Sequence, residues 1–304
     1  MSTRRQLLTL LMGAGLGACQ RAPELSGPQY LDHPPEGNTL PSYAFAVHPL
    51  YNPMQLFAAY QPLIDHLNRH IREVRFELEG SADYQMYEAK IRAAGPQFLL
   101  PNPWQTLLAQ RHGYNVIAEA GDSADFHGIF VLRQDSPILK FQDLKGRTVS
   151  YPSRTALAGC IMPQRHLHDQ GLDVVHDTTS LYVGSQEAAI MHAYLGTSHI
   201  AATWPPPWRA FQKEHPARAA ELRVIWETAP LINNSVMARQ DVPPHVVRRV
   251  QELLLGLEDS PQGADILKAA ETARFHPATN PSYDKVRDYV AAFERDVRPV
   301  ENDQ

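Results

Sequence analysis

Cysteine is scarce in this sequence of 304 residues, which contains only Cys19 and Cys160. Cys19 lies at the end of an N-terminal apolar segment, where we interpret it as a lipidation site. Cys160 then has no partner, so an intramolecular disulfide is excluded. Its neighbours in "LAGCIMP" are apolar, which favours a small buried core residue over a reactive thiol.

Positive charge is also limited. The chain has 28 lysines and arginines against 33 acidic residues, a net charge of −5, and it has no run of basic residues. Residues 1–18 include two arginines and no acid, so the remainder of the chain is more acidic still. This balance excludes a general binder of the nucleic-acid backbone.

Catalytic motifs are missing as well. The sequence has no G-x-S-x-G elbow, no Walker loop and no dinucleotide fingerprint. His66 and His70 stand one helical turn apart, as in a zinc site, but the glutamate of H-E-x-x-H is absent, so we interpret them as a solvated pair. An enzyme is the main alternative class; we expect no catalysis, no metal and no cofactor.

The N-terminus has the pattern of an export signal. Arg4 and Arg5 precede an apolar run over residues 7–16, which is too short to span a bilayer, and small residues follow up to Cys19. The ending "LGAC" resembles a bacterial lipobox, and the arginine pair leaves both the general and the twin-arginine export route open. We expect a signal peptide over residues 1–18, a flexible tether over 19–41, and a lipid-anchored protein in the periplasm.

After the tether, apolar runs alternate with amphipathic helices, which is typical of a parallel sheet covered by helices. The first series has strands at 43–49, 74–80 and 98–102 and helices at 54–71, 83–95 and 103–113. Extended segments at 115–120 and 127–133 lead into a second series. It has strands at 147–151, 180–184, 199–204 and 223–228 and helices at 141–146, 155–170, 186–195 and 207–222. An extended crossing at 233–244 then leads to helices at 244–257, 262–270 and 283–297.

This layout predicts two α/β lobes. Residues 42–134 would begin the first lobe, residues 135–232 would form the second, and residues 233–304 would return to the first with the C-terminal helices. Two crossing strands, near 133–138 and 231–239, would join the lobes and let them close.

Polar or small residues follow three of the predicted strands. Asn102 precedes Pro103 at the start of a helix, "SYPSRTALAG" surrounds another helix start with hydroxyls, and Gly184 precedes Ser185 at a third. Ligands of open parallel sheets bind beyond the carboxyl ends of the strands, where helix N-termini present free N–H groups. We interpret these junctions as donors to an oxyanion, although each serine alone is also an ordinary N-cap.

A family resemblance rests on the same residues. The segments "YQPLIDHLNRHI", "ADYQMYEAKI", "SYPSRTALAGCIMPQRHLHDQGLD", "YVGSQEAAIMHAYLG", "TWPPPW" and "ELRVIWETAPLINNSVMARQDVP" follow one another in the chain. In this order they resemble the phosphate, phosphite and phosphonate solute-binding proteins of ABC importers. The resemblance covers most of residues 43–297. It implies a type II periplasmic binding fold whose two lobes close over a ligand.

The resemblance also implies a site in the interlobe cleft. It implies that donors to the oxyanion come from two helix starts. From the residues themselves we also expect a side-chain contact from the first lobe and an aromatic wall from each lobe. The residues expected there are Ser153, Thr155, Ala156, Ser185 and Gln186 as donors, Asn102 as the first-lobe contact, and Tyr84 and Trp204 as walls.

The chain departs from the family pattern at two positions. Gln186 stands where the family has histidine, and Pro205 follows Trp204 where many relatives have an acid. A neutral amide donates less strongly than an imidazolium and can also accept a hydrogen bond. The expected ligand is a small oxyanion such as phosphonate, phosphite or phosphate, and a different small solute is the alternative.

The expected partner is an ABC permease, and the expected oligomeric state is a monomer. A membrane histidine kinase that reads the closed state of a sensor protein is the alternative partner. Both partners would use the same shift between open and closed lobes, because a ligand favours whichever state it binds more tightly.

Overall fold

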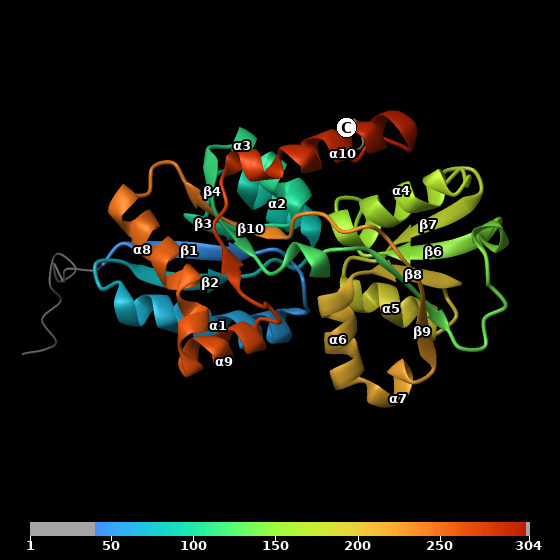
Figure 1. Cartoon of the computed structure of the whole chain (residues 1–304), viewed down its shortest axis with the longest axis horizontal. Helices are drawn as coiled ribbons and strands as arrows, with labels where there is room; N and C mark the ends of the chain where they lie inside the picture. Colours follow the sequence, from blue (N-terminus) through green and yellow to red (C-terminus); the bar gives the residue numbers. More distant parts are fainter. Residues whose placement is uncertain (1–39, 302–304) are drawn as a thin grey trace, which may run out of the picture. The chain divides into compact units, whose positions relative to one another are not determined.

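Two β-sheets, each covered by helices, organise residues 40–301, which are the residues that the computed structural model describes (Figure 1). Both sheets belong to one compact unit. The predicted signal peptide, Cys19 and nearly all of the predicted tether lie outside the described residues. Within residues 40–301, no helix is both long and apolar enough to cross a membrane.

The first sheet has the strand order β11-β4-β10-β3-β1-β2. β1 pairs in parallel with β2 and β3, whereas β10 runs antiparallel between β3 and β4. Its strands are β1 (Ser42–Val47), β2 (Arg75–Glu79), β3 (Phe98–Leu100), β4 (Tyr114–Ala120), β10 (Asn234–Arg239) and β11 (Phe275–His276). The short β11 has no counterpart among the predicted strands.

The second sheet has the order β7-β6-β8-β5-β9. β6 pairs in parallel with β7 and β8, and β5 runs antiparallel between β8 and β9. Its strands are β5 (Ile129–Arg133), β6 (Arg147–Tyr151), β7 (Thr178–Tyr182), β8 (Ile200–Thr203) and β9 (Leu222–Glu227). β5 enters the second sheet directly after the chain leaves the first, and β10 returns to the first sheet directly after the chain leaves the second. The prediction of two α/β lobes is confirmed.

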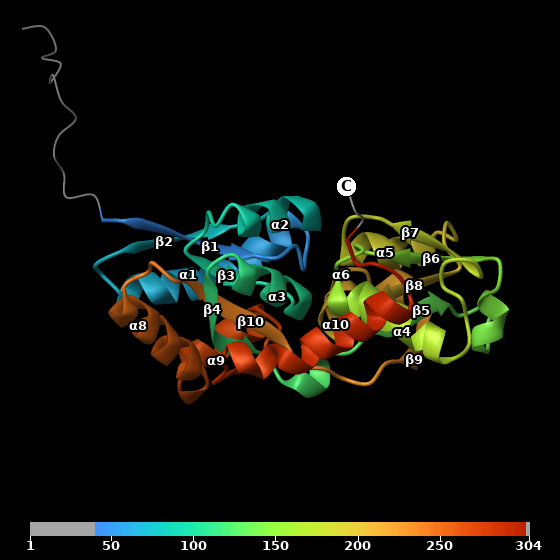
Figure 2. The ribbon, with the colours of Figure 1, turned by 90° about the horizontal axis from the view of Figure 1, so that it is seen from above.

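The helices cover both sheets (Figures 1 and 2). The helices of the first lobe are α1 (Pro53–His70), α2 (Tyr84–Arg92), α3 (Pro103–Arg111), α8 (Pro244–Leu255), α9 (Pro261–Ala269) and α10 (Asp284–Asp296). Those of the second lobe are α4 (Met162–Asp169), α5 (Gln186–Tyr194), α6 (Pro205–Glu214) and α7 (Pro216–Ala219). Single turns are η1 (Ser123–Asp125), η2 (Phe141–Leu144), η3 (Leu157–Ile161), η4 (Leu257–Asp259) and η5 (Asn280–Tyr283).

The crossings between the lobes differ from the prediction. We expected the first crossing near residues 133–138, but β5 pairs with β8 and β9, so the chain reaches the second sheet earlier, across residues 121–128. The second crossing runs over residues 228–233, between β9 and β10, and overlaps the predicted one. The first error arose because an extended run alone does not reveal which sheet it joins.

A third connection lies near the C-terminus. α10 begins beside α3 and extends toward α4 of the second lobe (Figures 1 and 2). Asp296 at its end forms an ion pair with Arg165 of α4 at 2.7 Å, and Val297 packs against the core of the second lobe. The C-terminal residues, which we assigned to the first lobe, thus contact both lobes.

Three predicted helices are shorter or broken. The helix expected at 207–222 is divided into α6 and α7 because Pro216 has no N–H and holds His215 outside the helical region, at φ −126° and ψ 55°. The helix expected at 155–170 begins with the π-turn η3, in which Ile161 N bonds Ala156 O. The helix expected at 141–146 is the single turn η2.

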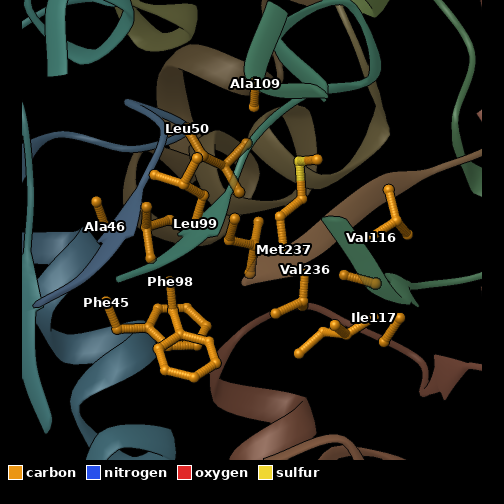
Figure 3. Packing of buried hydrophobic residues seen from close by; sticks show 14 of the residues in the cluster. Phe45, Ala46, Leu50, Phe98, Leu99, Ala109, Val116, Ile117, Val236 and Met237 are labelled. Carbon is orange, nitrogen blue, oxygen red and sulfur yellow. The ribbon is translucent and has the colours of Figure 1, made fainter. Parts of the chain in front are cut away.

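The core of the first lobe forms between β1, β3 and β10 and their covering helices (Figure 3). Phe45 and Phe98 stack with ring centroids 6.1 Å apart, and Met237 of β10 lies in the same cluster. This cluster continues into the second lobe, where it includes Leu157 and Trp204. The facing surfaces of the lobes are therefore partly apolar and in contact, which is a closed arrangement.

Candidate functional site

A small cavity lies between the two lobes, at the carboxyl ends of their parallel strands. Its volume is about 10 Å³, which is about the space needed for a single water molecule. None of its lining residues is lysine or arginine. They are His48, Tyr84, Asn102, Phe126, Ala156, Leu157, Ala158, Gly159, Gln186, Trp204 and Asn234. Of the eight residues predicted for the site, Tyr84, Asn102, Ala156, Gln186 and Trp204 are thus brought together.

One wall of the cavity is the helix start at η3. Ala156 is extended, and no side chain caps the turn that begins at Leu157. The first N–H groups of a helix have no acceptor within the helix, so a start without a cap leaves donors free. The small side chains of Ala158 and Gly159 leave this backbone accessible from the cavity. Free N–H groups at a helix start are a favourable location for an anion.

Gln186 has two side-chain partners, one from each lobe. Its Nε2 donates to the Tyr84 hydroxyl of the first lobe at 3.0 Å, and its Oε1 accepts from the Thr203 hydroxyl of the second at 2.9 Å. Gln186 and Tyr84 are both buried. Gln186 therefore joins the lobes across the cavity, and its amide carbonyl is already occupied.

Asn102 also joins the lobes. Its Oδ1 accepts from Gln105 N at 3.0 Å in a capping box at the start of α3, and its Nδ2 donates to Thr155 O at 3.3 Å. The capping bond holds the side chain in place, so the amide group is oriented toward the second lobe. Trp204 closes the cavity from the second lobe and packs edge-on against Phe126, with ring centroids 5.2 Å apart.

Ser153 and Thr155 line a different space. They face a wide cleft of about 1010 Å³ beside the cavity, together with Glu88 and Arg92 of α2. The Thr155 hydroxyl donates to the carboxylate of Glu88, and the Ser153 hydroxyl lies 3.1 Å from the Thr155 hydroxyl. Their hydroxyls are thus paired within the protein.

Glu88 is a buried carboxyl group at this border. Burial raises its pKa above the ordinary value, while hydrogen bonds from Thr155 and Gln105 act in the opposite direction. Sequence reasoning missed Glu88, because a glutamate within an amphipathic helix ordinarily faces solvent.

Ser185 caps α5, since its hydroxyl accepts from Ala188 N at 3.1 Å. It does not line the cavity. Glu187 of the same turn also lies outside the cavity and contacts Asn52 Nδ2 and His215 Nε2, each at 3.2 Å. The structure thus gives Glu187 partners away from the turn that begins at Leu157.

Two further predictions concern Cys160 and possible metal ligands. Cys160 is buried with its sulfur 3.4 Å from Arg298 Nη2, and burial raises the pKa of its thiol to about 11. The prediction of a small buried core residue is confirmed. Glu187, Glu214 and His215 are the described side chains whose ligand atoms gather within 4.8 Å of one another. His66 and His70 of α1, which stand one helical turn apart, do not belong to this group. His70 Nδ1 instead lies 2.9 Å from the His66 carbonyl oxygen.

His48 and Asn234 are the polar cavity residues that sequence reasoning missed. His48 directly follows β1, so the rule that pointed to Asn102 would have found it. Asn234 begins the returning strand β10, where the sequence carries no comparable signal. The side chain of His48 is 1% exposed, and its Nδ1 lies 2.9 Å from Leu100 O. Burial lowers the pKa of His48 to about 4.

Comparisons with known proteins agree with this arrangement. Residues 45–283 match the family model described as ABC transporter, phosphonate, periplasmic substrate-binding protein. A curated relative, the probable ABC transporter phosphite binding protein PhnD1 of Prochlorococcus marinus, is 22% identical over 186 residues. That match covers 57% of this chain and 63% of the relative, so the chain matches less than two thirds of the relative's length.

Solved structures share the fold. A binding protein component of an ABC phosphonate transporter from Pseudomonas aeruginosa matches with a TM-score of 0.78 and 13% identity, covering 84% of this chain and 87% of that one. PhnD1 from Prochlorococcus marinus in complex with methylphosphonate matches with a TM-score of 0.76 and 17% identity, covering 84% and 98%. The predicted type II periplasmic binding fold is confirmed.

The family model matches well over half of the chain, and the two-lobed fold is shared with solved structures of such binding proteins. The chain therefore belongs to the periplasmic substrate-binding proteins of phosphonate-type ABC transporters.

Proposed function

We propose that this protein binds a small oxyanion of the phosphonate, phosphite or phosphate type between its lobes and presents it to an ABC importer. The observation that carries the proposal is the uncapped helix start at Leu157, whose free N–H groups border the interlobe cavity. Neutral donors are sufficient for this role, because hydrogen bonds to a buried anion are charge-assisted. Because the cavity has room for about one water molecule, the lobes would open to admit the ligand and then close around it less tightly than in this arrangement.

The predicted site residues have different parts in this proposal. Leu157 to Gly159 and Ala156 supply backbone to the anion, Asn102 and Tyr84 contribute polar groups from the first lobe, and Gln186 holds the lobes together. Ser153 and Thr155 would act when the lobes open, because both line the wide cleft beside the cavity, through which a ligand would enter. Ser185 would serve mainly as the cap of α5.

Gly159 offers a direct test of the cavity. A Cβ added there would lie 2.8 Å from Pro152 Cγ and 2.9 Å from Gln186 Oε1, so Gly159→Ala narrows the site. Gly80→Ala is the matched control, since its added Cβ would meet only ordinary contacts at 3.6 Å or more. The purified full-length chain would be titrated calorimetrically with phosphate, phosphite, methylphosphonate, aminoethylphosphonate and sulfate, and with a few amino acids and organic acids.

We expect at least one of these anions to bind the parent protein and Gly80→Ala alike, and to bind Gly159→Ala at least tenfold more weakly. Binding that is equal in all three proteins would place the anion elsewhere. Binding of an amino acid or organic acid in place of every oxyanion would mean that the scaffold serves another solute.

The proposal extends to the cellular setting. Residues 1–18 would act as a signal peptide, and Cys19 would carry the lipid that anchors a monomer to the membrane on the periplasmic side. An importer is favoured over a sensor kinase because the family is defined by ABC transporters. Metabolic labelling with a radioactive fatty acid should label the parent chain and leave Cys19→Ala unlabelled; label retained in the variant would exclude this anchor.

A further inference from the structure

We propose that His48 accepts a hydrogen bond from the ligand, so that the site takes a tetrahedral oxyanion in its singly protonated form, with one hydroxyl group on the central atom. This inference rests on the proposed function and adds the protonation state and one binding residue to it. His48 reaches the cavity from the end of β1, opposite the helix start at Leu157.

The tautomer of His48 follows from its backbone contact. Its Nδ1 lies 2.9 Å from the carbonyl oxygen of Leu100, which can only accept, so Nδ1 carries the proton. Burial in the lobe lowers the pKa of His48 to about 4, so the ring holds no second proton near neutral pH. Its Nε2 then carries a lone pair that can accept a hydrogen bond.

The cavity therefore combines donors with acceptors. The helix start at Leu157 supplies N–H groups from the second lobe. From the first lobe come the His48 lone pair and Asn234, whose Oδ1 is buried and has no hydrogen-bond partner among the described residues. A fully ionised dianion would oppose these acceptors with lone pairs of its own. A singly protonated anion can place its ionised oxygens at the helix start and donate its O–H to Nε2.

Other titratable side chains lie around His48 and its neighbour Tyr84. α2 contributes Tyr84 and Tyr87, whose rings lie 6.4 Å from the His48 ring, and also Glu88. η3 contributes Cys160. Burial raises the pKa of both tyrosines and of Cys160, so these three stay neutral between pH 5 and 8. The contact from β3 is the Leu100 carbonyl, which does not titrate.

Glu88 is thus the protein group whose own titration could also make ligand binding depend on pH, because burial raises its pKa. Glu88→Gln removes this titration while it keeps a similar shape. The variant therefore separates a proton on the ligand from a proton on the protein.

The test is calorimetric titration of the full-length chain with methylphosphonate across the second ionisation of that ligand. We expect the dissociation constant to rise about tenfold for each pH unit above the ligand's second pKa, in the parent protein and in Glu88→Gln alike. Methanesulfonate has a similar shape and a single negative charge but no hydroxyl proton. It should bind at least tenfold more weakly than methylphosphonate does at the pH where methylphosphonate is a monoanion.

Two variants report on His48 itself. His48→Phe removes the acceptor and should bring methylphosphonate and methanesulfonate to similar affinities. The His48→Gln variant can turn its amide N–H toward the ligand. Its dissociation constant for methylphosphonate should therefore change little as methylphosphonate loses its second proton. The proposal is overturned if the parent protein binds the dianion as well as the monoanion, if Glu88→Gln abolishes the pH dependence, or if both His48 variants retain it. In those cases oxyanion binding itself stands, whereas a chain that binds no oxyanion at any pH overturns the proposed function too.

Discussion

Gln186 of the second lobe donates a hydrogen bond to the hydroxyl of Tyr84 of the first lobe, with 3.0 Å between nitrogen and oxygen. Both side chains are buried, so water does not readily replace this bond while the lobes are closed. Gln186, at the position where the family resemblance implies a histidine, thus has a structural part in holding the lobes together. A ligand that binds only the closed state gains affinity from every such interlobe contact.

Tyr84→Phe should weaken ligand binding without unfolding the protein. The ring stays in place, but closure loses one hydrogen bond and leaves the Gln186 amide without its partner, at a cost of about 1–2 kcal/mol. This corresponds to about a 5- to 30-fold rise in the dissociation constant, measured by calorimetry. Tyr43→Phe is the matched control, since Tyr43 lies on β1 against Phe76 and Phe98 and not at the cavity. Equal losses in both variants would contradict the assigned role of Tyr84.

His48 should make the protein less stable at acidic pH. Its pKa is about 4 in the folded state against 6.5 ordinarily, so between these values the unfolded chain binds more protons than the folded one. Stability is therefore lost as pH falls from 6.5 toward 4, by about 3 kcal/mol from this residue. Urea titrations at pH 4.5 and 6.5 would measure the free energy of unfolding of the parent and of His48→Gln. The difference between the two proteins should be smaller at pH 4.5 than at pH 6.5. A difference that stays constant would show that His48 does not titrate in this range.

Glu88 should have the opposite effect. Its pKa is raised in the folded state, so just above the ordinary carboxyl pKa the folded protein binds more protons than the unfolded chain. The stability that this group contributes is complete at low pH and is lost as pH rises through the folded-state pKa. Glu88→Gln should thus gain stability relative to the parent as the pH is raised from 4 to 7, in the same urea titrations. A relative loss over that range would mean that hydrogen bonds from Thr155 and Gln105 outweigh burial.

Gly263→Ala should destabilise the first lobe. A Cβ at this position in α9 would lie 1.9 Å from the carbonyl oxygen of Leu257, so the backbone of η4 or α9 must move. We expect a loss of about 3 kcal/mol in the free energy of unfolding, typical of overpacking. Gly95→Ala is the control, because its added Cβ would meet only one backbone atom, at 3.9 Å. If the two variants have the same midpoint of thermal unfolding, the close approach of α9 to η4 is wrong.

Much of the fold follows from local sequence patterns. The periodicity of α1 and the caps Asn102 and Ser185 act over one helical turn, so the sequence alone located these helix starts. The same local reasoning misplaced the first crossing and missed β11, because strand pairing depends on residues far apart in the chain.

For the site, the sequence alone showed which helix starts follow strand ends, and it thereby grouped Asn102, Ala156 and Gln186, which line one cavity in the structure. Only the tertiary structure decided that Thr155 faces Glu88, that Gln186 bonds Tyr84, and that His48 reaches the cavity. The physical reason is that hydrogen-bond partners and burial depend on how the two lobes meet. A residue's type determines what it can donate or accept, and the fold determines which partner it finds.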